Sequence, residues 1–285
     1  MHVDESAAEN VEYGGSKEKF WFRHAELGRS LWKAARPNTG EDWSEKIAEQ
    51  MARQLGLPCA RYELAICDGK RGVITPTLVP EGASLVLGNE LLVAQESNYP
   101  RPGTVSKFRT SYHTIDIVLQ NIQQSGAGLP PEWTPLPDVI TAQDLFVGYL
   151  LLDAWIGNTD RHHENWGIIE WIQSPPHRVR QRYLAPTYDH ASSLGRLLLD
   201  RDRQERMGTK DQGHTVEAYT NKASSALYLN SEDAKPLKTV DAFRIAAQRS
   251  PTARAAGVRL PESRGTRWDR ARKRGDRWDP RHVRR

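Results

Sequence analysis

The sequence predicts an α+β fold of two lobes, a small β-rich N-terminal lobe over residues 12–80 and a mainly helical C-terminal lobe over residues 81–249. Two observations support this division. Residues 62–66 and 73–79 flank an Asp-Gly turn, and the first of them alternates apolar with polar side chains, which predicts a β-hairpin. Residues 141–156 begin with a Thr/Asp capping box and continue as a broad apolar stripe, which predicts a buried helix.

The two ends of the chain differ from its middle. Residues 1–11 are polar and acidic, so we expect a disordered N-terminus without a signal peptide. Residues 250–285 hold eleven Arg and one Lys against one Glu and three Asp, a net charge of +8, which leaves −4 for the rest of a chain whose total is +4. This tail has little apolar periodicity and is predicted to be disordered. Its composition fits either a basic segment that binds nucleic acid or the product of a shifted reading frame.

Cysteine usage and hydropathy restrict the compartment. Cys59 and Cys67 form no metal-binding motif, and two reduced thiols fit a cytoplasmic protein. No apolar run approaches the length of a membrane span, so we expect no membrane partner.

The loop at residues 157–167 follows the long predicted helix directly. Its Asp160 and Asn165 are separated by four residues. A protein kinase uses this spacing to place a base for the substrate hydroxyl beside a magnesium ligand. On spacing alone, an ordinary polar turn with an N-cap is the favoured explanation of the loop. A second acidic residue, Asp189, follows another predicted strand and supplies the further metal ligand that kinase chemistry needs.

The run from Asn158 to Asn165, together with Tyr188-Asp189, resembles the HipA-like serine/threonine kinases. The resemblance implies a two-lobed protein-kinase-like fold, with ATP and Mg²⁺ as cofactors and a serine or threonine hydroxyl of a protein as acceptor. It implies Asp160 as the catalytic residue and Asn165 and Asp189 as metal ligands. In the longest members the kinase is a toxin that is held by a helix-turn-helix antitoxin and acts on an aminoacyl-tRNA synthetase, so both are implied partners.

A glycine pair near the N-terminus precedes two lysines. Glycines let a backbone approach a ligand closely, and neighbouring N–H groups can cradle phosphate. A plain hairpin also explains the segment. Beside the features that follow it, this segment resembles the Gly-rich loop of the HipA-like kinases, which implies nucleotide contacts from Gly14, Gly15, Ser16, Lys17 and Lys19.

Lys33 ends a predicted strand, and a predicted helix follows it. A kinase needs a strand lysine that reaches the phosphates and a helix glutamate that holds it, which suggests Lys33 and Glu45. Asp42 and Glu45 also resemble a capping box, so the sequence leaves two roles open for Glu45. The apolar face of this helix is predicted to carry Ile47, Ala48, Met51 and Leu55. Val79 follows the predicted hairpin, at the point in the chain where a kinase links its two lobes beside the adenine. It is assigned to nucleotide binding from the order of the elements alone.

Two histidines and a basic stretch need separate predictions. His162 and His163 lack the spacing of a zinc helix. The family resemblance implies that His162 supports the loop and contacts the nucleotide, and His163 is expected to be exposed. A cluster of basic residues lies between residues 191 and 213: Arg196, Arg201, Arg203, Arg206 and Lys210. They could lie on a solvated helix, or on a segment that receives an acidic or hydroxyl-bearing partner. The sequence does not separate these two explanations.

Other functions fit parts of the pattern. The Asp, His and Asn side chains could form a metal-dependent phosphohydrolase site, although the His-Asp pair usual for such sites is missing. A lipid kinase uses a similar Asp-Arg-His-x-x-Asn loop, but no lipid-binding helix is evident. A kinase fold without activity could serve as a binding protein.

Overall fold

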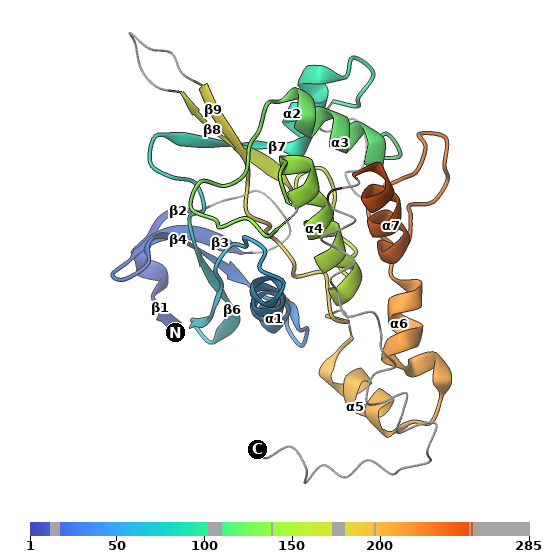
Figure 1. The fold of residues 1–285 in the computed structure, drawn as a ribbon. Coiled ribbons are helices and arrows are strands. Elements are labelled where there is room, and N and C mark those ends of the chain that lie inside the picture. The colour runs from blue at the N-terminus through green and yellow to red at the C-terminus, as the bar shows by residue number, and fades with distance from the viewer. Residues whose placement is uncertain are drawn as a thin grey trace.

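The computed structural model describes residues 1–11, 18–101, 110–137, 139–172, 180–196, 198–250 and 252. The predicted nucleotide-binding residues Gly14, Gly15, Ser16 and Lys17 lie outside the described residues, and so does nearly all of the basic tail. Figure 1 shows a sheet-rich N-terminal part beside a mainly helical C-terminal part. The predicted α+β architecture is therefore confirmed.

A six-stranded sheet makes up most of the N-terminal part, in the order β1-β5-β6-β4-β3-β2. The predicted hairpin is present and its strands pair in antiparallel register from Glu63↔Ile74 to Cys67↔Lys70. Burial of aromatic rings on one face, including Phe20, Phe22 and Trp32, gives this sheet its own apolar core. The strands are β1 (His2–Val3), β2 (Ala8–Val11), β3 (Lys19–His24), β4 (Gly28–Ala34), β5 (Glu63–Cys67) and β6 (Lys70–Pro76).

The prediction that residues 1–11 are disordered is wrong. β1 pairs in parallel with β5, and β2 pairs in antiparallel register with β3, so this segment supplies both edge strands of the sheet. Backbone pairing with strands far away in the sequence orders a segment whose own polar composition gives no sign of it.

Helix α1 (Glu41–Gln54) packs against β5, β6 and α4, and three residues of its predicted apolar face, Ala48, Met51 and Leu55, lie in or against the main core. The predicted capping box is absent, because Gly40 is the N-cap and makes no side-chain cap hydrogen bond. Ile47 is 42% exposed, whereas Glu41, Glu45 and Glu49 are buried. Buried carboxylates need cationic partners, so α1 carries a buried charged surface beside its apolar one.

A three-stranded sheet, β7-β8-β9, follows the linker that contains Val79. It consists of β7 (Ala83–Leu87), β8 (Gly167–Ile172) and β9 (Arg180–Leu184), all antiparallel. Helix α2 (Gly88–Gln95) continues directly from β7. The sheet therefore brings the linker next to the strand that leaves the predicted catalytic loop.

The main apolar core lies among the helices of the C-terminal part. Helix α4 (Ala142–Ile156) is central to it and starts with the predicted Thr141/Asp144 capping box. α3 (Ile115–Gln124) and α7 (Thr239–Arg249) pack on α4. Trp155 departs from the predicted buried stripe, because it is 46% exposed.

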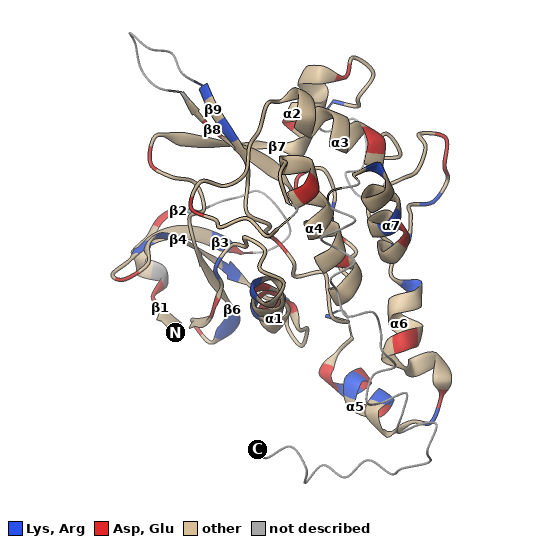
Figure 2. Ribbon diagram, in the orientation of Figure 1, with Lys and Arg blue, Asp and Glu red and all other residues tan. Residues whose placement is uncertain are grey.

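Helices α5 (Asp200–Gly208) and α6 (Val216–Lys222) extend away from this core (Figure 1). α5 carries both signs of charge along its length, as Figure 2 shows, and it has no buried residue. Within the part of the chain that the structure describes, no helix is both long and apolar enough to cross a membrane.

Candidate active site

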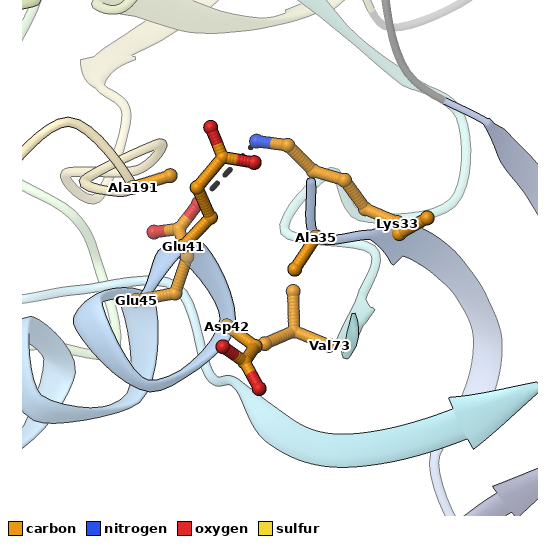
Figure 3. Close-up of a pocket in the computed structure, with 8 residues that line it drawn as sticks. Lys33, Ala35, Glu41, Asp42, Glu45, Val73 and Ala191 are labelled. Atoms are coloured by element: carbon orange, nitrogen blue, oxygen red, sulfur yellow. Dashed lines mark hydrogen bonds and ion pairs between the residues drawn. The ribbon is translucent and has the colours of Figure 1, made fainter. Parts of the chain in front are cut away.

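Lys33 lies between two carboxylates that come from distant parts of the chain. Its Nζ is 3.3 Å from Oε1 of Glu45 and 2.5 Å from Oδ1 of Asp189. Lys33 is on β4 and Glu45 is on α1, and the two side chains point toward each other beside a narrow pocket that Val73 and Ala191 also line (Figure 3). The structure thus brings together three of the predicted site residues.

The charges of this cluster shift one another's protonation. Burial alone would lower the pKa of Lys33, but Asp189 and Glu45 outweigh that effect and raise it above its ordinary value. Burial raises the pKa of Glu45 to about 7, with Lys33 opposing the shift and Asp189 adding to it. One cation therefore serves two carboxylates, and Lys33 stays charged.

The backbone around Asp189 is held in an unusual conformation. Asp189 has a φ of 56°, a left-handed value that few non-glycine residues adopt. Its N–H donates to Tyr62 Oη at 2.9 Å, and the N–H of His190 donates to Glu45 Oε2 at 2.7 Å. These bonds tie the Asp189 turn to the residue before β5 and to α1, so the second oxygen of Glu45 fixes the turn while the first contacts Lys33.

The loop from Gly157 to Asn165 begins where α4 ends. Gly157 has a φ of 63°, which favours glycine and ends the helix as predicted. Arg161 is fully buried, and its Nε and Nη2 each donate to an oxygen of Asp153, both at 2.8 Å. Its Nη1 donates to the carbonyl of Asn165 at 2.7 Å. One guanidinium thus joins the middle and the end of the loop to α4.

Asp160 and Asn165 lie close together on this loop. Asn165 Nδ2 donates to the Asp160 carbonyl at 2.7 Å. The amide nitrogen of Asn165 is thus used within the loop, and its Oδ1 is the atom that can bind a metal ion. The hydroxyl of Ser192 donates to Asp160 Oδ2 at 3.1 Å.

The two histidines are both buried. His162 Nδ1 accepts from the N–H of Glu164 at 3.1 Å, and its Nε2 is 3.7 Å from Asp160 Oδ1. His162 thus supports the loop, as expected. The prediction that His163 is exposed is wrong, because His163 is 6% exposed and its Nδ1 hydrogen-bonds to Tyr99 at 2.7 Å.

The remaining predicted residues lie around this cluster. Lys19 on β3 is directly opposite Lys33 on β4, which places both side chains on one face of the sheet. Val79 is half-buried in the linker between β6 and β7. The loop and the Asp189 turn are joined by a hydrogen bond of 3.0 Å from the Tyr188 hydroxyl to the Glu164 carbonyl.

Sequence reasoning missed several residues that build the site. Tyr62, Arg161, Ser192 and Glu41 were not singled out, and Arg196 was left among the basic residues of its segment. Arg161 lies inside the diagnostic loop, and its position between the two site residues was the signal available. Glu41 and Ser192 offer no signal, because their partners are far away in the sequence.

The donors of the site suit magnesium. Asn165 and Asp189 provide an amide oxygen and a carboxylate, the hard oxygen ligands that Mg²⁺ prefers. The left-handed turn at Asp189 sets its carboxylate beside Lys33, where a group with negative charge would be neutralised. The described residues contain no cluster of three or more His, Cys, Asp and Glu side chains able to hold a metal ion.

Comparison with known proteins supports the fold. No protein-family model and no curated protein sequence matches this chain. The crystal structure of the Helicobacter pylori proinflammatory kinase CtkA superimposes with a TM-score of 0.62 at 18% identity, over 91% of this chain and 88% of that chain. The Shewanella oneidensis toxin HipA, solved with HipB and operator DNA, gives a TM-score of 0.39 at 13% identity, over 90% of this chain and 61% of that chain.

The match to CtkA at this identity shows the fold and no more. The chain therefore has a protein-kinase-like fold, and the fold expected from the sequence resemblance is confirmed.

Proposed function

We propose that this protein is an ATP- and Mg²⁺-dependent kinase that transfers the γ-phosphate to a serine or threonine hydroxyl of a protein. The observation that carries the proposal is the double contact of Lys33 with Glu45 and Asp189. A strand lysine held by a helix glutamate beside a metal-binding aspartate is the arrangement that phosphoryl transfer by kinases requires.

Each residue then has a distinct task. Lys33 binds the phosphates, and Glu45 orients Lys33 through the ion pair between β4 and α1. Asn165 and Asp189 would hold Mg²⁺, which when bound neutralises charge on the phosphates. In this proposal Lys19, on the same face as Lys33, and Val79 in the linker contact the nucleotide, and His162 supports the loop.

Asp160 is the base in this proposal. Its carboxylate orients the acceptor hydroxyl and takes its proton as the new oxygen–phosphorus bond forms, while the bond from the γ-phosphorus to the bridging oxygen breaks and ADP leaves. The protein supplies mainly positioning and charge, because little covalent chemistry falls to the enzyme in phosphoryl transfer. The buried Arg161–Asp153 pair holds the loop that carries this carboxylate.

The test is transfer from γ-labelled ATP with Mg²⁺ into proteins, lipids and water in parallel. We expect labelled protein from the unaltered chain. Asp160→Ala should lower transfer by about 10²–10⁴-fold, because it removes the general base. Its nucleotide affinity, measured by calorimetry, should change little. The surface variant Asp116→Ala, which removes the exposed pair with Arg249 in the helical part, is the matched control.

The same assay separates the alternatives. Label in lipid would identify a lipid kinase, free phosphate without labelled protein would identify a phosphohydrolase, and neither product would identify an inactive binding protein. Normal transfer by Asp160→Ala would refute the assignment of the base. The helix-turn-helix antitoxin and the aminoacyl-tRNA synthetase substrate stay predictions of the family resemblance, to be tested by phosphoproteomics after induced expression of the unaltered chain and of Asp160→Ala.

A further inference from the structure

The segment that follows the Asp189 turn lies along the first turns of α1. The N–H of Gly40 donates to the Arg196 carbonyl at 3.1 Å, and the Ser44 hydroxyl donates to the Ser193 carbonyl at 3.2 Å. Figure 3 shows Glu41 and Glu45 extending from α1 on the side where Ala191 lies. α1 is therefore attached to this segment by several bonds in addition to the Glu45–His190 contact.

Arg196 is the main side-chain link in this contact. Its Nη1 contacts Oε1 of Glu41, which is 2% exposed, and its Nη2 donates to the Ser192 hydroxyl at 2.8 Å. The Arg196 side chain is only 15% exposed, and its buried Nε has no hydrogen-bond partner among the described residues. A planar guanidinium with two such arms holds both partners in fixed relative positions.

The direction of the hydrogen bonds is set by chemistry. A guanidinium can only donate, so the Ser192 oxygen accepts from Arg196. The single hydroxyl proton of Ser192 then points to Oδ2 of Asp160 at 3.1 Å. A continuous chain of polar contacts thus runs from Glu41 on α1, through Arg196 and Ser192, to the carboxylate of Asp160.

We propose that Ser192 and Arg196 are positioning residues that couple α1 to the catalytic carboxylate of Asp160. The inference rests on the proposed function, because it assigns them a role in orienting its base. α1 also carries Glu45, which holds Lys33. A shift of α1 therefore disturbs the phosphate-binding lysine and the base together, so that both are in place only when α1 is docked.

The first experiment compares kcat and the KM for ATP in four proteins: the unaltered chain, Ser192→Ala, Ser192→Thr and Ser125→Ala. Ser192→Ala should lower kcat by about 10–100-fold, because a misplaced reacting group costs rate steeply, while KM for ATP stays within about twofold. Ser192→Thr keeps the hydroxyl and should restore most of kcat. Ser125, a buried serine that donates to the Ile122 carbonyl at the end of α3, is the matched control and should leave kcat unchanged.

The second experiment tests the coupling itself. Arg196→Met should lower kcat in the same manner, and adding Ser192→Ala to it should cost little more, because both changes break one chain of contacts. Arg182→Met, which removes a partner of Glu170 on the three-stranded sheet, is the matched control. Additive losses from Arg196→Met and Ser192→Ala would overturn the coupling.

The outcomes separate the two proposals. If the unaltered chain transfers phosphate and Ser192→Ala keeps its full kcat, the positioning role is wrong and the proposed function stands. Equal losses in Ser192→Ala and Ser125→Ala would also overturn the positioning role, because they would reflect general destabilisation. If the unaltered, folded chain transfers no phosphate at all, the proposed function fails and the positioning role fails with it.

Discussion

Two charged clusters of the site, one around Arg161 and one around Lys33, differ in how completely their groups are paired. Arg161 is 0% exposed and meets both oxygens of Asp153, the Asn165 carbonyl and the Thr187 hydroxyl. Lys33 is 18% exposed and faces two carboxylates, of which Asp189 is 37% exposed.

The difference indicates that the Arg161 cluster has a structural role, whereas the Lys33 cluster is suited to chemistry. The guanidinium of Arg161 has several hydrogen-bond partners around it, so its task is to fix the loop. The Lys33 cluster sets two carboxylates against one cation. The pKa of Glu45 is raised chiefly by burial and further by Asp189, although Lys33 opposes the shift. Such a cluster can rearrange around a phosphate or a cation, and strongly shifted groups of this kind gather at functional sites.

The largest expected effect is on stability, from Arg161→Met. It leaves Asp153 buried without its cation, which should cost about 3–5 kcal/mol of the free energy of unfolding. Arg249→Met, which breaks the exposed pair with Asp116, should leave the free energy of unfolding nearly unchanged. Urea unfolding of both variants checks this, and equal losses would remove the distinction between the two clusters.

The next effect is on activity, from Lys33→Met. Transfer should fall on the order of 10²–10³-fold, as for the loss of one charged or hydrogen-bonding group at the transferring phosphate. Stability should suffer less than in Arg161→Met, because Glu45 can take up a proton. Lys70→Met, which breaks an exposed pair with Glu18 in the same sheet, is the control for charge removal. A stability loss as large as that of Arg161→Met would contradict the comparison.

A smaller effect concerns pH. The pKa of Glu45 in the folded chain is raised to about 7, above its unfolded value, so the folded state binds this proton more tightly. The contribution of Glu45 to stability is therefore present at low pH and is lost as pH rises toward 7. Glu45→Gln should remove this dependence, so that the variant gains on the order of 1–3 kcal/mol relative to the unaltered chain between pH 5 and pH 8.

Urea unfolding at pH 5 and pH 8 measures that difference. Glu63→Gln is the control, because hydrogen bonds from Arg61 and Lys46 outweigh desolvation and lower the pKa of Glu63. Its difference between the two pH values should have the opposite sign or be absent. The same pH trend in both variants would show that Glu45 is not the group responsible.

The smallest effect is expected from Lys19→Met. Lys19 is half-buried and lies opposite Lys33, so it shares the face of the sheet that the proposed function assigns to the phosphates. The KM for ATP should rise only about 3–10-fold at low salt and less at high salt, because a partly exposed charge is screened. A salt-independent loss as large as that of Lys33→Met would contradict this ranking.

Local sequence patterns correctly predicted the features that depend on short-range spacing, namely a hairpin, a helix cap and a helix end. The hairpin of β5 and β6, the capping box of α4 and the helix end at Gly157 all depend on neighbours within a few residues. The pairing of Lys33 with Glu45 was also predicted, but the competing cap role was excluded only by the structure, because α1 begins at Glu41 after Gly40.

Periodicity failed where charge is buried. Of the four apolar residues predicted for one face of α1, Ala48, Met51 and Leu55 pack in or against the main core, but Ile47 is exposed. The helix also buries Glu41, Glu45 and Glu49, which apolar spacing did not predict. Each of these carboxylates meets a cation: Arg36 and Arg196 at Glu41, Lys33 at Glu45, and Lys46 and Arg53 at Glu49. A pattern of apolar spacing cannot detect partners supplied by other elements.

The sequence by itself determined the α+β division, the short loop from Asp160 to Asn165 and the order of the acidic residues, because these features depend on local spacing. Only the tertiary structure decided that the N-terminal residues complete the sheet, that His163 is buried, and that Ser192 and Arg196 reach Asp160 and Glu41. The physical reason is that hydrogen bonds between distant segments form only after folding brings their backbones together.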